Sequence, residues 1–319
     1  MDSKNLLDAI VELIRRTSSD LPIDVVTAIK EGLLTEKRDS IAHKTLKMIL
    51  KNIDIAREKS LPMCQDTGTP VFYVNYPAGV SQIDIKKKIN QAIKESVHKL
   101  YLRPNIVDTL TGKNLGDRTG PGYPVINFEE WKKDYIKVIL MLKGGGCENV
   151  GTQYALPSPI NLSLHVVSGE ALGDKDSRVN AGRDLEGVRR CILDAAHKAQ
   201  GRGCAPGVIG VCIGGDRVLS YEESKRQLLR NLDDRNKNPV LGKLEQSIMK
   251  DANKLGIGPM GFGGRTTLLG VKIGSLCRIP PSYFVSVTYM CWAYRRRGFE
   301  YKACSERSES NGKVKRWLY

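Results

Sequence analysis

Apolar residues at the start of the chain recur at the spacing of a helix. The pattern covers residues 4–16, 22–33 and 38–58, where apolar positions return every three or four residues. Ser19 and Asp20 interrupt it between the first two segments, as is typical where one helix ends and the next begins. The sequence therefore predicts a helical N-terminal part.

Shorter apolar runs in the rest of the chain predict strands that alternate with further helices. Strands are expected over 70–76, 135–143, 207–213, 267–274 and 283–290, and helices over 82–99, 182–200, 221–232 and 239–254. The predicted fold is α+β, with mixed α/β layers after the helical part. Residues 299–319 are polar, basic and aperiodic, which indicates a loose tail after a domain over 1–298.

The net charge does not alter the predicted fold and only weakly limits the possible partners. The net charge of +15 is compatible with nucleic-acid binding, but the basic residues are spread along helices without a recognisable DNA-binding or RNA-binding motif. A positive surface equally attracts small dicarboxylates or an acidic partner. We expect neither nucleic acid nor a membrane as partner, because no run approaches the roughly 20 apolar residues of a membrane span.

The N-terminus reads as an amphipathic helix and not as a secretion signal, so we expect a cytoplasmic protein. Its eight cysteines are then thiols or metal ligands and not disulfides. No C-x-x-C pair is present, which excludes a simple zinc ribbon, and the histidines lie away from the cysteine loops (His43, His98, His165 and His197). Cysteines from several loops are able to hold an iron–sulfur cluster if the loops converge.

Glycine-rich or cysteine-bearing loops are expected at 64–70, 143–149, 203–217 and 290–298. Glycine runs followed by polar residues leave backbone N–H groups able to face an anion. The stretch over 256–267 looks like a P-loop, but Pro259 stands where the first glycine belongs and Arg265 replaces the lysine. A structural turn or a carboxylate-facing loop is the better interpretation.

Together these loops resemble a known family. The motifs "CQDTG", "KGGGCEN", "CAPGVIGVCIGGDR", "LGIGPMGFGGRTTLLGVKI" and "YFVSVTYMCWAYRR" are similar to those of class I fumarases and L-tartrate dehydratases, which are iron–sulfur hydro-lyases. The resemblance is strongest to the α subunit of two-subunit fumarases and covers about residues 5–298. It implies a catalytic domain that hydrates fumarate to malate reversibly, with a 4Fe–4S cluster as Lewis acid.

The resemblance also assigns residues. It makes Cys64, Cys204 and Cys291 the ligands of the cluster, which leaves one iron open. Cys191 and Cys212 are interpreted as buried structural thiols. The remaining cysteines are unassigned (Cys147, Cys277 and Cys304). Cys147 stands in the second glycine loop, where it is able to line the site without being a ligand.

Asp66, beside a cluster ligand, is the expected acid for the departing hydroxyl, and its alternative role is to order the turn before Gly68. Gln65 and Arg103 are expected to bind a substrate carboxylate, although such residues singly are more often surface residues. The backbone of Gly144, Gly145 and Gly146 is expected to complete the substrate site.

Two features of the family are absent from the sequence. The histidine common shortly before the third cysteine is missing, since no histidine follows His197. The part of the family that supplies the catalytic base has no counterpart either, so we expect a β subunit to complete the site. L-tartrate dehydratase is the alternative within the family, and a non-catalytic basic binding protein with buried thiols is the alternative from another class.

Overall fold

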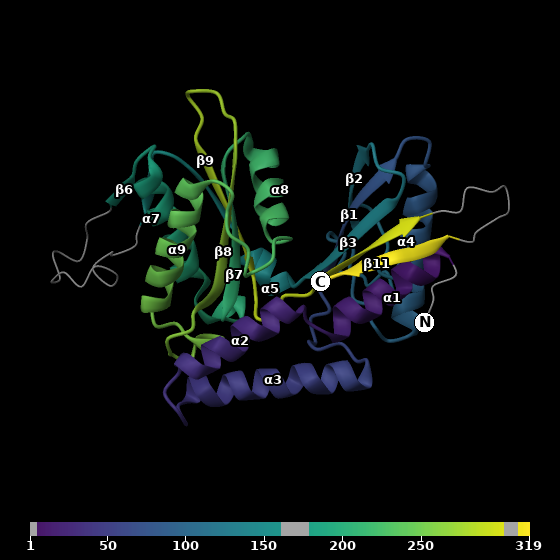
Figure 1. Cartoon of the computed structure of the whole chain (residues 1–319), viewed down its shortest axis with the longest axis horizontal. Helices are drawn as coiled ribbons and strands as arrows, with labels where there is room; N and C mark the ends of the chain where they lie inside the picture. Colours follow the sequence, from purple (N-terminus) through teal and green to yellow (C-terminus); the bar gives the residue numbers. More distant parts are fainter. Residues whose placement is uncertain (1–4, 161–178, 303–311) are drawn as a thin grey trace. The chain divides into compact units, whose positions relative to one another are not determined.

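The computed structural model describes residues 5–160, 179–302 and 312–319 (Figure 1). The chain divides into two compact units. Unit 1 consists of Met1–Ile23, Lys51–Gly144 and Arg295–Tyr319, and unit 2 of Asp24–Leu50 and Gly145–Tyr294. Each unit has its own sheet, which confirms the predicted α+β fold class. None of the described helices combines the length and the apolar composition that a membrane span needs.

The predicted N-terminal helices are present, and two of them run from one unit into the other along the chain. They are α1 (Leu6–Ser19), α2 (Ile23–Thr35) and α3 (Ile41–Lys59). The side chain of Asn5 caps α1 by accepting the N–H of Asp8 at 2.9 Å. Helix α1 ends at Ser19, next to Asp20, where the sequence predicted a break.

The sheet of unit 1 has five strands in the order β11-β10-β3-β1-β2. Their bounds are β1 (Thr69–Pro77), β2 (Val125–Trp131), β3 (Ile136–Lys143), β10 (Arg296–Lys302) and β11 (Lys313–Leu318). Apolar side chains of β1, β3 and β10 form one core with those of α1 and of α4 (Gln82–His98). The first strand, β1, begins directly after the first cysteine loop, so this core anchors the loop.

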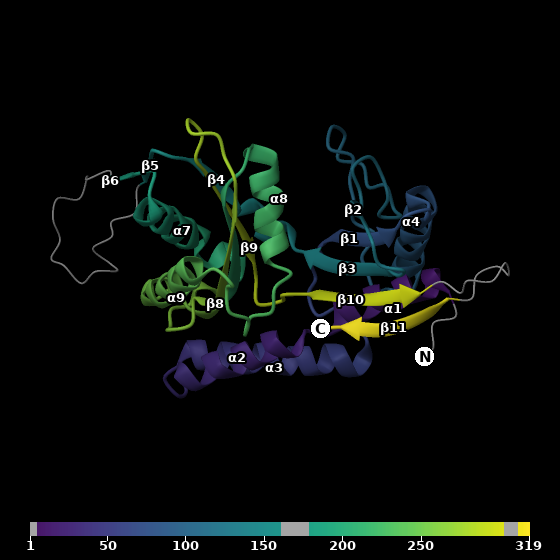
Figure 2. The same ribbon diagram turned by 45° about the horizontal axis from the view of Figure 1, so that its top comes forward.

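Strands β10 and β11 differ from the prediction. Residues 299–302 and 313–318 were expected in a loose tail, but they pair with each other, and β10 pairs antiparallel with β3 (Figure 2). Phe299 and Tyr301 enter the core of unit 1, and Trp317 packs against it. The charged residues of this hairpin do not prevent the pairing, because β11 at the sheet edge is only partly buried and the buried Glu300 of β10 pairs with Arg316 of β11 at 2.8 Å. Residues 303–311 lie outside the described part.

The sheet of unit 2 has four strands in the order β4-β9-β7-β8. Their bounds are β4 (Thr152–Ala155), β7 (Gly207–Gly214), β8 (Leu268–Leu276) and β9 (Phe284–Met290), and β5 (Ser158–Ile160) pairs separately with β6 (Val179–Ala181). The larger core lies on the face covered by α7 (Leu185–Ala199) and α9 (Pro239–Lys254). Helix α8 (Arg217–Gln227) covers the opposite face (Figure 1).

Helix α8 was expected over 221–232 but lies several residues earlier. It begins after Asp216, whose carboxylate caps the N–H groups of Val218 and Leu219 at 2.7 and 2.9 Å. The helix packs through small residues, since Ser220 is buried and its hydroxyl oxygen accepts a hydrogen bond from the Ser286 hydroxyl of β9 at 2.7 Å. A helix that packs through serines has no apolar stripe, and periodicity therefore misplaces it.

Gly210 of β7 is needed for this close packing. A Cβ at this position would lie 2.2 Å from the carbonyl oxygen of Ser224 in α8. We expect Gly210→Ala to lower the free energy of unfolding by about 1–3 kcal/mol, because the helix must move away from the sheet. Urea denaturation measures the change.

Gly242 in α9 is the matched control for this prediction. Its Cβ would meet nothing closer than 3.7 Å, so Gly242→Ala is expected to leave the stability unchanged or to raise it by up to about 1 kcal/mol. Equal destabilisation by both substitutions would contradict the packing argument.

Candidate functional site

The first cysteine loop forms a tight turn in unit 1. The Asp66 carboxylate oxygen Oδ1 accepts the N–H of Gly68 at 2.9 Å, as in a turn ordered by an aspartate. Gly68 has a φ of +78°, and a Cβ there would lie 2.8 Å from the carbonyl carbon of Leu142 in β3. Asp66 therefore does order the turn, as its alternative interpretation stated, and this turn presents Cys64 and Gln65 directly before β1.

Arg103 lies beside the same turn. Its N–H donates to Thr67 Oγ1 at 3.3 Å, and its guanidinium Nη1 donates to the Gln65 carbonyl oxygen at 3.2 Å. Gln65 and Arg103 are both exposed. The structure thus brings together four of the predicted site residues (Cys64, Gln65, Asp66 and Arg103). It also places Arg118, which no sequence motif marked, against this turn.

Cys204 and Cys291 lie in neighbouring segments of unit 2. Cys204 follows the short helix η1 (Gln200–Gly203) in a left-handed conformation with a φ of +52°. Its carbonyl oxygen accepts the N–H of Trp292 at 3.3 Å, which joins the Cys204 segment to the residue after Cys291. The two cysteines are 87 residues apart in the numbering of the sequence, and sheet pairing of β7 with β9 brings their segments together.

The ring of Tyr289 in β9 packs against the segment that contains Cys204. A Cβ at Gly203 or Gly207 would lie 2.5 or 2.2 Å from its ring, so these glycines on either side of Cys204 make room for the ring. Burial raises the pKa of the Tyr289 hydroxyl well above its usual value, and the nearby thiols add to this effect (Cys291, Cys147 and Cys204). Cys147, unassigned in the sequence, therefore lies in the neighbourhood of the two predicted ligands of unit 2.

The second glycine loop is partly helical. Gly144 is buried and ends unit 1, whereas Gly145 and Gly146 are exposed and form the first turn of α5 (Gly145–Asn149). This differs from the predicted loop over 143–149. A Cβ at Gly146 would lie 3.5 Å from the carbonyl oxygen of Arg202, so this end of α5 lies close to η1 and to the Cys204 segment.

The P-loop-like stretch over 256–267 contacts the Cys204 segment. Its short helix η2 (Pro259–Gly261) donates the Met260 N–H to the Ala205 carbonyl oxygen at 2.7 Å. Further along the stretch, the Glu36 carboxylate accepts the N–H groups of Arg265 and Thr266 at 2.8 and 2.7 Å. The stretch is therefore a structural turn, which is one of the two interpretations that the sequence left open, and its N–H groups bind the carboxylate of Glu36.

Two other cysteines, Cys191 and Cys212, fit structural roles. Cys191 in α7 and Cys212 in β7 are buried, as expected, and burial raises the pKa of the first to about 12 and of the second to about 11. Such thiols are unreactive. Cys277 is exposed, and no described cysteine forms a disulfide. Cys304, like His165, lies outside the described residues.

The three predicted ligands are chemically suited to an iron–sulfur cluster (Cys64, Cys204 and Cys291). Thiolates are the usual cluster ligands, and a set of three leaves one iron without a protein ligand. Cys64 belongs to unit 1, whereas Cys204 and Cys291 belong to unit 2. Within residues 5–160, 179–302 and 312–319, no three side chains of His, Cys, Asp or Glu are grouped as a ready-made metal site.

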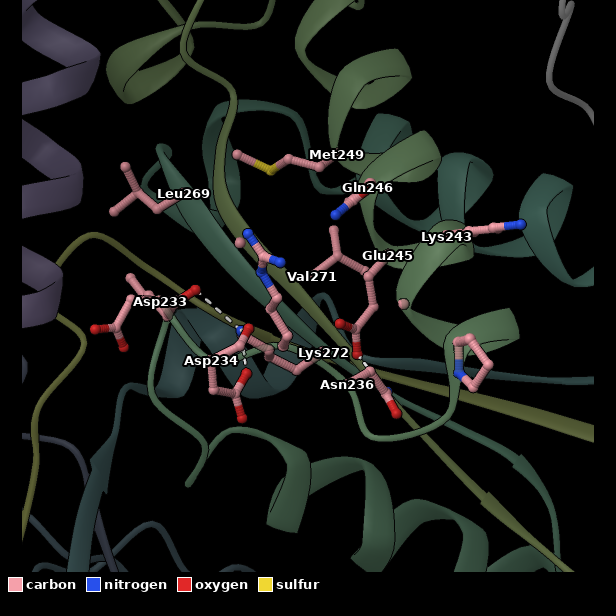
Figure 3. Close-up of a pocket in the computed structure, with 15 residues that line it drawn as sticks. Asp233, Asp234, Asn236, Lys243, Glu245, Gln246, Met249, Leu269, Val271 and Lys272 are labelled. Carbon is pink, nitrogen blue, oxygen red and sulfur yellow. Dashed lines mark hydrogen bonds and ion pairs between the residues drawn. The ribbon is translucent and has the colours of Figure 1, made fainter.

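A separate cavity of about 470 Å³ lies in unit 2 between α9, β8 and the segment before α9 (Figure 3). Lys272 reaches Asp234 Oδ1 at 2.5 Å, and Glu245 accepts from Asn236 at 2.8 Å (Figure 3). Glu245 also pairs with Arg230 at 2.8 Å. None of the predicted site residues lines this cavity. Because Lys272 and Glu245 already have partners of opposite charge, the cavity is a poor site for a dicarboxylate.

Comparison with known proteins identifies the family. Residues 7–300 match the family described as "Fumarate hydratase (Fumerase)". A protein of Geobacillus stearothermophilus named class I fumarate hydratase is 48% identical over 316 residues, which is 99% of this chain and 57% of that protein. The chain thus spans little more than half of that relative.

Two further relatives are similar to the chain over most of their own length. The Methanocaldococcus jannaschii protein named L(+)-tartrate dehydratase subunit alpha is 32% identical over 91% of this chain and 95% of its own length. The Escherichia coli K12 protein of the same name is 26% identical over 91% of this chain and 89% of its own length. These matches, together with the turn and the cysteine segments described above, show that the chain belongs to the fumarate hydratase family.

Proposed function

We propose that the protein is the α subunit of an iron–sulfur hydro-lyase that interconverts fumarate and malate. The observation that carries this proposal is the family match over residues 7–300, which includes every predicted site residue. The 48% identity to a protein named class I fumarate hydratase favours fumarate as the substrate. Near full-length similarity to proteins named subunit alpha favours a β subunit as partner.

The proposed cofactor is a 4Fe–4S cluster held by Cys64, Cys204 and Cys291. When bound, it supplies Lewis acidity toward the hydroxyl group of malate through its open iron. Asp66 gives a proton to the departing hydroxyl oxygen and takes one from water in the reverse direction. Its place in the turn next to Cys64 supports this role, since the hydrogen bond to Gly68 holds the carboxylate in one orientation.

Substrate recognition is proposed for residues on the same loops. Arg103 pairs with one carboxylate of the substrate, and Gln65 beside it donates a hydrogen bond from its exposed side chain. The backbone of Gly144, Gly145 and Gly146, where β3 passes into α5, completes the substrate site. The β subunit contributes the base that removes the carbon-bound proton. We place the enzyme in the cytoplasm, where its thiols stay reduced.

L-tartrate is the second candidate substrate, because two relatives that match over most of their length are named for it. It differs from malate by one hydroxyl group, which the proposed residues of this chain do not distinguish. A non-catalytic basic binding protein is the alternative from another class, and a colourless, iron-free preparation made without oxygen would favour it.

Reconstitution with the partner tests the proposal. The isolated chain, loaded with iron and sulfide without oxygen, is expected to be brown but essentially inactive on fumarate, because it has no identified base for the proton on carbon. Addition of a β subunit encoded beside it is expected to restore hydration of fumarate, measured by absorbance.

The same mixture assayed on L-tartrate decides between the two substrates. Robust fumarate hydration by the isolated chain would contradict the two-subunit proposal. An assembled, brown complex without activity on either substrate would reject the hydro-lyase proposal itself.

A further inference from the structure

Arg118 is a buried arginine in the connection between α4 and β2. Only 3% of its surface is exposed, and its backbone has a φ of +58°. A residue with a Cβ is unfavourable in this left-handed conformation and persists there only where its surroundings hold it. The preceding residue, Asp117, ties the connection to α4 through Lys94 at 2.8 Å. Contacts of the Arg118 side chain must therefore stabilise this buried, left-handed conformation.

The Arg118 guanidinium binds three separate segments of unit 1. Its Nη1 donates to Thr67 Oγ1 at 2.5 Å, to the Arg103 carbonyl oxygen at 3.0 Å and to Asn105 Oδ1 at 3.0 Å. Its Nη2 donates to the Gly68 carbonyl oxygen and to the Tyr123 hydroxyl. None of these acceptors is a carboxylate, so the interaction is a network of directed hydrogen bonds rather than an ion pair.

These contacts join the two loops that carry proposed site residues. Thr67 and Gly68 are the last two residues of the turn that contains Asp66, and Arg103 begins the other loop. Thr67 Oγ1 also accepts the Arg103 N–H at 3.3 Å, and Arg103 in turn donates to the Gln65 carbonyl oxygen at 3.2 Å. Arg118 is therefore buried against the turn, and its hydrogen bonds fix the position of Asp66 relative to Arg103.

We infer that Arg118 is a positioning residue of the site, an inference that rests on the proposed function. Its buried guanidinium locks the turn over 64–68 to the Arg103 loop and does not touch the substrate. A planar guanidinium group with several N–H donors is required to bind these acceptors at once, because they lie in different segments of the chain. A lysine has one nitrogen on a flexible stem and cannot reach them together.

Kinetics of the assembled enzyme test this inference. Arg118→Ala keeps the backbone cost of the left-handed conformation, since alanine also has a Cβ, and removes only the guanidinium group. We expect cluster content equal to that of the unmodified enzyme and a kcat/KM on fumarate lower on the order of 100-fold, because a small misplacement of the acid and the arginine slows the reaction. Arg118→Lys is expected to be equally impaired, whereas added guanidinium ion is expected to restore part of the loss in Arg118→Ala.

Arg297 is the matched control. It is another largely buried arginine of unit 1, and it donates to Asp20 at 2.6 Å and to the Tyr319 carbonyl oxygen at 2.8 Å rather than to the turn. Arg297→Ala is expected to lower stability but to keep kcat/KM within about twofold and to show no response to guanidinium ion. An Arg118→Ala enzyme with normal cluster content and normal kcat/KM would overturn the inference.

Hydrogen exchange gives a readout that does not depend on activity. In the isolated chain, Arg118→Ala is expected to speed amide exchange in peptides covering 64–70 and 103–110 on the order of tenfold, with little change over α1. Thr67→Val keeps the shape of the side chain and removes one acceptor, so it is expected to act in the same direction if Arg118→Ala fails to fold. Unchanged exchange in these peptides would reject the positioning role, whether or not the unmodified complex hydrates fumarate.

Discussion

Serine in place of Cys64, Cys204 or Cys291 is expected to abolish the broad visible absorbance of the reconstituted cluster. Each substitution removes one of three thiolates, and a serine hydroxyl is a poor ligand for iron at neutral pH. The neighbouring segments of Cys204 and Cys291, joined through Trp292, give this prediction its structural support. Iron and sulfide content, measured with the absorbance under anaerobic conditions, report the result.

Three other cysteines serve as controls for this experiment. Cys191→Ser changes a buried thiol of α7, Cys277→Ser an exposed thiol, and Cys147→Ser a thiol near Tyr289 that is not proposed as a ligand. All three variants are expected to keep the cluster. Full cluster content in any of the proposed ligand variants would reject that ligand, and loss of the cluster in Cys147→Ser would add Cys147 to the set.

Asp66→Asn in the assembled enzyme is expected to lower kcat about 100-fold or more while the cluster is retained. A positioned acid contributes roughly this factor, and an amide cannot give a proton to a departing hydroxyl. The substitution is informative because the amide oxygen of asparagine still accepts the Gly68 N–H that Asp66 Oδ1 binds at 2.9 Å. The turn is thus kept while the acid is lost.

Asp66→Ala separates the two roles of this residue further. It removes both the acid and the acceptor for Gly68, so it is expected to lower kcat as Asp66→Asn does and also to lower stability by about 1 kcal/mol. If Asp66→Asn has nearly normal kcat and only Asp66→Ala is impaired, Asp66 orders the turn and does not act as the acid.

Local sequence determined most of the secondary structure and the motifs of the site. Helices α1, α3 and α9 carry apolar residues on one face, and periodicity alone locates them. The turn over 64–68 is also local, because an aspartate two residues before a glycine closes on the glycine N–H. The motifs around the cysteines were sufficient to indicate the family, which the comparisons confirm.

The tertiary structure decided which residues meet. Helix α8 packs through Ser220, and β11 pairs only because β10 lies beside β3, so neither element shows its place in local periodicity. Arg118 and Glu36 read as ordinary charged residues in the sequence, yet the first binds the turn 50 residues earlier and the second binds a loop 229 residues later. Hydrogen bonds between distant segments depend on how the sheets and loops pack, and a local pattern carries no information about their partners.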